Sequence, residues 1–359
     1  MDGVVTSAFT VPTDEPESDG TFEWDATTIV VVEVEAAGER GLGYTYGPKA
    51  VGALVDELLA DDLRGRDAFD VPGAWHTLGA RLRNAGRPGI GSMALAAVDI
   101  ALWDLKARLL GLPLAKLLGA FHGEVPIYGS GGFTSYSHER LAEQLGGWVA
   151  EGIPRVKMKL GRDPGADPAR LDAARGAIGD DAELFVDANG AFGAKEALGW
   201  AHRFRREWGV SWFEEPVSSA DFAGLRLVRE QGPGGLDVAA GEYGYVLADF
   251  RNLLDAGAVD CLQADVTRCG GITGLLQVSA LASEQGIDLS GHCAPAVSAS
   301  TLCAVERLRH LEWFHDHVRV EAALFDGVPE VQDGCARPDF SRPGHGLELK
   351  RSDAARWAA

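Results

Sequence analysis

The chain has 359 residues, of which 46% are hydrophobic and 24% are charged, and this composition excludes a disordered chain, a collagen and a coiled-coil rod. Lys and Arg total 33 against 53 Asp and Glu, and the formal net charge of −20 argues against nucleic acid as a partner because such a surface repels phosphates. No apolar run approaches the ~18 residues that a membrane helix needs, so we expect no membrane partner.

The five cysteines include no C-x-x-C pair, which argues against a disulfide framework or a structural zinc site. The N-terminal residues also lack the basic and apolar regions of a signal peptide. Both features predict a protein of the reducing cytoplasm.

Residues 1–124 have the pattern of a small α+β domain. They open with a polar, acidic stretch at 12–19 that predicts a loop, and a β-branched run at 27–34 predicts a strand. Residues 41–47 predict a turn-rich connection. Apolar residues that recur every three or four positions predict a helix over 92–110, which Gly111 and Pro113 end.

From residue 125 onward, short apolar runs alternate with helix-length segments, and the runs start 22 to 30 residues apart. This spacing accommodates one strand, one helix and two loops, and eight such units predict a (β/α)8 barrel. The runs cover residues 125–130, 155–160, 184–188, 210–214, 236–240, 259–264, 287–291 and 309–313. We expect the barrel to span 125–325, with residues 326–359 packing back on the capping domain at 1–124.

Three acids end neighbouring runs, and the carboxyl ends of barrel strands form the active site. Asp187, Glu214 and Glu242 lie on three adjacent strands, which are about 4.8 Å apart. Three like charges at this distance repel, so a cation is present or some carboxylates are protonated. An all-oxygen set suits a hard ion, most simply Mg²⁺. The alternative is that each acid pairs separately with a surface Arg or Lys.

Lys157 and Lys159 lie two apart on one strand, so both side chains face the barrel interior. Two neighbouring ammonium groups beside a metal ion are expected to lower each other's pKa. A neutral lysine is a base that can take a proton from carbon. The alternative, a pair of solvated strand lysines, is weaker here because every strand of a closed barrel is central.

Asp265 and His292 end the sixth and seventh runs. A carboxylate on the neighbouring strand can orient an imidazole and stabilise its protonated form, so this pair predicts a second acid/base group across the cavity from the lysines. The sequence separation of 27 residues between this Asp and this His gives only weak support for a catalytic pair by itself. The alternative is that His292 is a structural histidine. The barrel register favours the catalytic interpretation.

The order and spacing of these segments resemble the enolase superfamily, in its mandelate racemase-like branch (the mandelate racemase/muconate lactonizing enzyme family). The resemblance covers nearly the whole chain, and no single motif carries it. The matching segments are 27–34, Gly91-Ser92-Met93-Ala94 with the helix at 99–110, Lys157-x-Lys159, Asp187-Ala188-Asn189, Trp212-Phe213-Glu214-Glu215-Pro216, Gly241-Glu242, Asp265 with Arg268-x-Gly270-Gly271-Ile272-Thr273, Gly291-His292 and His310-Leu311-Glu312.

The resemblance implies an N-terminal α+β capping domain, completed by the C-terminal segment, on a modified (β/α)7β TIM barrel. It implies Mg²⁺ as the cofactor, bound by Asp187, Glu214 and Glu242. The choice of Glu214 over Glu215 rests on the resemblance, because spacing does not separate adjacent residues.

The resemblance also implies catalytic roles. Lys159 would be one acid/base group, assisted by Lys157, and the His292–Asp265 dyad would be the other. Glu312 would donate a hydrogen bond to the substrate carboxylate, which requires an elevated pKa.

Three further residues are expected to contact the substrate: Asn189, Arg268 and Trp24. Asn189 follows the expected metal ligand Asp187, and Arg268 follows Asp265 by three residues. Trp24 lies in residues 10–24, which we expect to form a mobile lid whose acids are mostly solvated.

The implied chemistry is Mg²⁺-dependent removal of the α-proton of a carboxylate substrate through an enediolate. Family members of the cycloisomerase and dipeptide-epimerase type carry a lysine where this chain has Asp265, which favours the dyad type. Many dyad-type members with the Gly-Gly-Ile-Thr segment dehydrate sugar acids, so we expect a lyase that forms a 2-keto-3-deoxy acid in carbohydrate acid catabolism.

Two alternatives remain open. A racemase or epimerase of a 2-hydroxy acid or amino-acid derivative would use the same residues. A non-catalytic barrel is disfavoured because all the acid/base positions are filled. The expected partners are a small-molecule carboxylate and, by the resemblance, further copies of the chain in a homo-oligomer.

Overall fold

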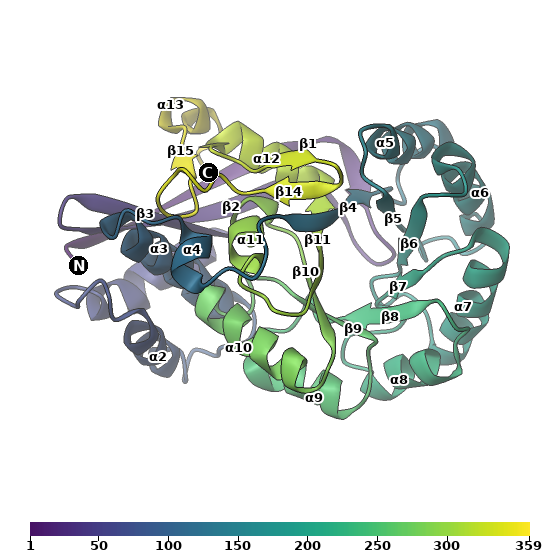
Figure 1. Cartoon of the computed structure of the whole chain (residues 1–359), viewed down its shortest axis with the longest axis horizontal. Helices are drawn as coiled ribbons and strands as arrows, with labels where there is room; N and C mark the ends of the chain where they lie inside the picture. The colour runs from purple at the N-terminus through teal and green to yellow at the C-terminus, as the bar shows by residue number, and fades with distance from the viewer.

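The computed structural model describes residues 1–359 and places a capping domain beside a barrel (Figure 1). Eight parallel strands pair in chain order, and the last pairs with the first, so the barrel is closed. They are β4 (Val125–Gly131), β5 (Arg155–Lys159), β6 (Glu183–Asp187), β7 (Trp212–Glu214), β8 (Asp237–Ala240), β9 (Cys261–Ala264), β10 (Asp288–Gly291) and β11 (Leu308–Phe314). Each strand falls on one of the eight predicted runs, which confirms the predicted fold class.

A helix follows each barrel strand and covers the outside of the barrel. These helices are α5 (His138–Ala150), α6 (Asp167–Ile178), α7 (Ala194–Trp208), α8 (Phe222–Gln231), α9 (Leu247–Asp255), α10 (Gly271–Glu284), α11 (Pro295–Leu302) and α12 (His315–Leu324). A core of 67 buried hydrophobic residues joins them to the outward faces of the strands and continues into the capping domain. No helix of the chain combines the length and the hydropathy needed to cross a bilayer.

The capping domain is an antiparallel sheet with helices packed against it. Its elements are β1 (Gly3–Ser18), β2 (Glu23–Ala36), β3 (Glu39–Tyr46), α1 (Ala50–Leu54), η1 (Val55–Leu59), η2 (Ala60–Asp62), α2 (Val71–Arg81), α3 (Ile90–Leu109) and α4 (Leu114–Leu118). The predicted strand at 27–34 lies within β2, and the predicted helix at 92–110 corresponds to α3. A second core of 21 buried hydrophobic residues lies in this domain.

The predicted turn-rich connection at 41–47 is wrong, because these residues form most of β3. Its glycines serve close packing and not a turn. A Cβ at Gly41 would lie 2.2 Å from the Ala101 carbonyl oxygen, and one at Gly43 would lie 2.1 Å from that of Ala97. Helix α3 therefore lies directly against a strand surface that has no side chains at these two positions.

The predicted loop at 12–19 is also wrong, because β1 continues to Ser18. A bulge between Pro12 and Glu17 interrupts the pairing, after which Glu17 lies opposite Trp24 in β2. The acidic stretch therefore forms the arm of a long hairpin.

The C-terminal segment contacts both the barrel and the capping domain (Figure 1). Its elements are β12 (Phe325–Asp326), β13 (Glu330–Gln332), β14 (Cys335–Arg337), β15 (Glu348–Leu349), α13 (Arg351–Ala354) and η3 (Ala355–Trp357). Strand β14 pairs antiparallel with barrel strand β4. The last residue donates its backbone N–H to Ala8 of β1, so the end of the chain lies on the capping sheet.

Candidate active site

An aromatic layer fills the barrel beneath the polar end of its strands. The rings of Phe185 and Trp212 stack at 5.4 Å, and Tyr128 lies 5.4 Å from Phe185. Side chains on a strand alternate between its faces, so the next inward residue after Phe185 is Asp187 and the next after Trp212 is Glu214. The aromatic layer is thus the floor of a carboxylate-lined site.

The three predicted acids come together on this floor. Asp187 and Glu214 are partners in the register of β6 and β7, and Glu242 follows β8. Each offers a carboxylate oxygen within 4.8 Å of the other two, and all three side chains are buried. Burial raises the pKa of Glu214 to about 8, which the nearby Lys157 only partly offsets. Crowded, buried carboxylate oxygens of this kind fit a hard divalent cation.

Both strand lysines point into this carboxylate group. Lys157 Nζ lies 2.6 Å from Glu214 Oε1 and 2.7 Å from Glu312 Oε1, and Lys159 Nζ lies 2.5 Å from Asp187 Oδ2. Burial lowers the pKa of each lysine, but the carboxylates outweigh it and the net shift is upward. Without a metal ion, ion pairing with the carboxylates therefore exceeds the repulsion between the two ammonium groups, and the lowering that we expect beside a bound ion stays a prediction.

His292 and Asp265 form a hydrogen-bonded pair, with Nδ1 2.8 Å from Oδ2. Asp265 Oδ1 accepts the N–H and the O–H of Thr267, each at 2.7 Å, so the carboxylate is held on both oxygens. Nε2 of His292 lies 2.9 Å from Glu242 Oε2. Burial lowers the pKa of His292, but Cys293, Glu242 and other acidic groups around it raise it well above its usual range.

Glu312 lies between the lysines and the histidine. Its Oε1 accepts hydrogen bonds from Ser130 Oγ at 2.6 Å and from Lys157. Burial raises the pKa of Glu312, but the charges of Lys157 and His292 outweigh it and hold that pKa well below the usual range. The expected elevated pKa is therefore wrong, and Glu312 is ionised in this arrangement.

A cavity of about 270 Å³ opens above these groups. Lys159 reaches it from β5 and His292 from the end of β10, with β4 and β11 between them on one side of the barrel. The cavity is lined by Asp19, Phe22, Trp24, Ala26, Thr27, Lys159, Asn189, Glu242, Tyr243, Arg268, His292, Cys293, Glu312, Phe314 and His317. The two groups that the sequence predicted as acid/bases thus share one cavity.

The barrel-borne residues predicted to contact the substrate line this cavity. The backbone N–H of Asn189 donates to Asp187 Oδ1 at 2.8 Å, and its own Oδ1 is buried without a hydrogen-bond partner. Arg268 donates to the Glu242 carbonyl oxygen at 3.2 Å, and its guanidinium lies 5.2 Å from the centre of the Tyr243 ring. Both side chains retain polar groups that a ligand can use.

Trp24 covers the cavity from the capping domain. Its ring packs edge-on against Phe133 at 5.5 Å and stacks with Phe22 at 6.2 Å. Its Nε1 donates to Glu17 Oε2 at 2.8 Å. Burial raises the pKa of Glu17 to about 8. The hairpin formed by β1 and β2 therefore supplies one wall of the cavity.

Sequence reasoning missed several cavity residues. Cys293 follows His292 directly, and its residue type alone gives no sign of a place in the cavity. Tyr243 follows Glu242, and its position next to a predicted ligand was the available signal. His317 follows the eighth strand near the rim, where the sequence favours a structural or exposed histidine; in the structure it lines the cavity and stacks on Tyr46 at 3.4 Å.

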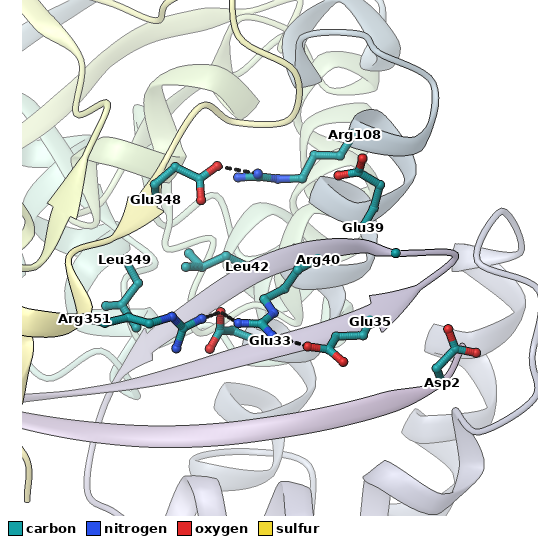
Figure 2. A pocket seen from close by; sticks show the side chains of 11 residues that line it. Asp2, Glu33, Glu35, Glu39, Arg40, Leu42, Arg108, Glu348, Leu349 and Arg351 are labelled. Atoms are coloured by element: carbon teal, nitrogen blue, oxygen red, sulfur yellow. Dashed lines mark hydrogen bonds and ion pairs between the residues drawn. The ribbon is translucent and has the colours of Figure 1, made fainter.

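A larger pocket, of about 620 Å³, lies away from this site between the capping sheet and the C-terminal segment (Figure 2). Its arginines are already paired with its acids: Arg108 with Glu348 at 2.5 Å, and Arg351 and Arg40 with Glu33. These ion pairs fasten the C-terminal segment to the capping domain, so we assign this pocket a structural role.

Comparison with known proteins identifies the family. The family model described as "Mandelate racemase / muconate lactonizing enzyme, N-terminal domain" matches residues 7–119, and that described as "Enolase C-terminal domain-like" matches residues 140–354. The chain belongs to the mandelate racemase/muconate lactonizing enzyme family. This family lies within the enolase superfamily, whose members include dehydratases and cycloisomerases.

Individual members of this family are similar over almost the full chain. A 3,6-anhydro-alpha-L-galactonate cycloisomerase from Streptomyces coelicolor is 36% identical, with 89% of each chain covered. A solved mandelate racemase/muconate lactonizing enzyme-like protein from Rubrobacter xylanophilus is 61% identical, with a TM-score of 0.98, over 100% of this chain and 99% of that one. L-talarate/galactarate dehydratase from Salmonella typhimurium LT2, liganded with Mg and L-lyxarohydroxamate, is 29% identical, with a TM-score of 0.91, over 100% of this chain and 92% of that one.

Proposed function

We propose that this protein is a Mg²⁺-dependent dehydratase that converts an acid sugar to a 2-keto-3-deoxy acid. The observation that carries the proposal is the arrangement of the cavity. Three buried carboxylates meet at one point, and a lysine and a hydrogen-bonded histidine approach the same space from different strands.

Asp187, Glu214 and Glu242 would hold the Mg²⁺ ion. When bound, the ion would stabilise the second negative charge that builds on a substrate carboxylate as its α-proton leaves. The Mg-liganded dehydratase relative supports this assignment, because its fold matches this chain over its full length.

Lys159 and the His292–Asp265 pair would move the protons. One of them removes the α-proton, depending on the configuration of the substrate. An acid on the cavity wall then protonates the β-hydroxyl, which leaves as water, and the enol product becomes the 2-keto acid. Lys157 would act as a positioning residue, because it holds Glu214 and Glu312 together from beneath.

The substrate would be a small carboxylate with several hydroxyl groups. Asn189 and Arg268 retain polar groups on the cavity wall, and Trp24 supplies an apolar cover. Such a mixture of polar donors and an aromatic face suits a polyol acid.

A second candidate is an isomerase that uses the same α-proton chemistry. The 36% identity to a cycloisomerase favours this candidate. Against it, this chain has Asp265 at the position where cycloisomerase-type members of the family carry a lysine. A cycloisomerase, racemase or epimerase returns a product of unchanged mass, whereas a dehydratase product lacks one water.

The test is incubation of the Mg²⁺-loaded protein with a panel of sugar acids in D₂O. We expect a product that reacts with semicarbazide, has lost one water and carries deuterium. Deuterium uptake at the α-carbon without loss of mass would identify an isomerase. If no acid in the panel exchanges its α-proton and calorimetry detects no Mg²⁺ binding, the proposed function is wrong.

A further inference from the structure

His292, Cys293 and Glu312 form a compact group of three different donor atoms on the cavity wall. Cys293 Sγ lies 3.4 Å from His292 Nε2 and 3.3 Å from Glu312 Oε2, and Nε2 lies 3.3 Å from Oε2. All three side chains are buried, yet all three line the cavity. No member of this group is a proposed Mg²⁺ ligand, although His292 Nε2 also lies 2.9 Å from Oε2 of the proposed ligand Glu242.

The spacing of this group matches the ligand sphere of a tetrahedral zinc ion. Zn–S bonds are about 2.3 Å and Zn–N or Zn–O bonds about 2.0 Å, so tetrahedral ligand atoms lie roughly 3.3–3.8 Å apart. The three separations in this group, 3.3, 3.3 and 3.4 Å, lie at the lower end of this range. Thiolate and imidazole are ligands that Zn²⁺ accepts and that Mg²⁺ avoids.

The surrounding residues hold the donor atoms in place. Asp265 accepts from His292 Nδ1, which directs Nε2 to the cavity, as carboxylates do for zinc-bound histidines. Lys157 and Ser130 engage Oε1 of Glu312, which leaves Oε2 toward Cys293.

The backbone explains how two successive side chains reach one cavity. In a regular strand, neighbouring side chains point to opposite faces. Cys293 has a positive φ of 50°, so the chain turns immediately after His292 and brings both side chains inward. A non-glycine residue in this conformation is strained, and such strain is typical of functional sites.

We propose that His292, Cys293 and Glu312 form a second metal site, which binds Zn²⁺ or another thiophilic divalent ion. Binding forms metal–sulfur, metal–nitrogen and metal–oxygen bonds as the thiol proton and the Nε2 proton of the imidazolium leave to solvent, and a water completes the fourth position on the cavity side. The ion occupies His292 Nε2, so it inhibits the enzyme reversibly. The inhibition, but not the binding site, rests on the proposed function.

Co²⁺ tests the site directly, because a thiolate ligand gives cobalt a charge-transfer absorption that oxygen and nitrogen ligands do not give. Co²⁺ is added to the Mg²⁺-loaded protein, and we expect this band to saturate at one ion per chain. The band disappears in Cys293→Ser and persists in the matched control Cys335→Ser, which changes the most exposed cysteine. Another cluster, Asp14, Glu17 and His315, has no sulfur and adds no such band.

Absence of the band from the unaltered protein would overturn the proposal, and so would its persistence in Cys293→Ser. Circular dichroism and Mg²⁺ calorimetry report whether the variant is folded, and Cys293→Ala serves as a second variant. In turnover assays, we expect Cys293→Ser to need at least tenfold more Zn²⁺ for half-inhibition. The cobalt spectrum needs no turnover, so failure of this site and failure of the proposed function are distinguishable.

Discussion

The two sides of the cavity hold their proton carriers in different ways. On the lysine side, Lys159 bonds to Asp187 and Lys157 bonds to Glu214, and both acids belong to the proposed Mg²⁺ set. On the histidine side, His292 Nδ1 bonds to Asp265, which lies outside that set. Both sides also contact an acid of the other kind, since Lys157 pairs with Glu312 and His292 Nε2 lies 2.9 Å from the proposed ligand Glu242. The difference is that each lysine has its closest partner in the Mg²⁺ set, whereas the closest partner of the histidine, Asp265, lies outside it.

This difference implies different dependence on the metal. A divalent ion on Asp187 and Glu214 takes over negative charge that otherwise stabilises the lysine ammonium groups, so its binding lowers the lysine pKa values. The orientation of the imidazole depends on Asp265 and persists whether or not the ion is bound. Metal binding thus changes the charge around both proton carriers, through Asp187 and Glu214 on one side and Glu242 on the other, while Asp265 keeps the imidazole oriented.

We expect the largest effect when the two proton carriers, Lys159 and His292, are replaced one at a time. Lys159→Met should abolish α-deuterium exchange for one substrate configuration, and His292→Asn should abolish it for the other, each by about 10²–10⁴-fold. NMR of paired epimeric sugar acids in D₂O measures this exchange. Lys195→Met, at an exposed site on α7, is the matched control and should exchange normally. Normal exchange in both active-site variants would refute the assignment of the two sides.

Neutralising one carboxylate should weaken metal binding and disturb the lysine side first. Glu214→Gln removes a proposed ligand and the closest partner of Lys157, so we expect Mg²⁺ affinity to fall by at least the ~10–100-fold that loss of an outer-sphere partner costs. Isothermal calorimetry provides the measurement, with Glu183→Gln at the opposite, exposed end of β6 as the control. An unchanged dissociation constant would remove Glu214 from the ligand set.

Asp265→Asn addresses the histidine side alone. Nearby acids raise the pKa of His292, and loss of the Asp265 charge should lower that pKa. Since neutral imidazole is the base, the ascending limb of the pH–rate profile should move to lower pH. The maximal rate should fall by about 10–100-fold through loss of orientation. A shift of this limb to higher pH would contradict the account.

The smallest expected effect comes from Glu17, which belongs to neither side. Its pKa is raised from 4.5 to about 8, so the folded state binds its proton more tightly than the unfolded state. Stability from this group is complete below pH 4.5 and is lost as pH rises to about 8. Glu17→Gln should therefore match the unaltered protein at pH 4.5 and exceed its Tm by about 1–3 °C at pH 9. Equal Tm differences at both pH values would show that folding does not shift the pKa of Glu17.

The sequence predicted the barrel and the convergence of its polar residues because both follow from a repeating pattern. A strand recurs about every 26 residues, and side chains alternate along each strand, so the inward positions of Lys157, Lys159, Asp187 and Glu214 can be counted. The register between β6 and β7 then brings Asp187 and Glu214 side by side.

Other features depend on contacts that no local pattern contains. The raised lysine pKa values and the lowered Glu312 pKa result from ion pairs between strands far apart in the chain. Gly41 and Gly43 favour a turn by residue type, but they lie in a strand and pack against helix α3. Cys293 enters the cavity through a backbone turn that its residue type does not indicate.

The central claim is that one ion-binding carboxylate group lies between two proton carriers. A crystal structure with Mg²⁺ and a substrate analogue tests it most directly. We expect the ion on Asp187, Glu214 and Glu242, with Lys159 Nζ and His292 Nε2 on opposite faces of the α-carbon. An ion bound elsewhere, or both nitrogens on the same face of that carbon, would contradict it.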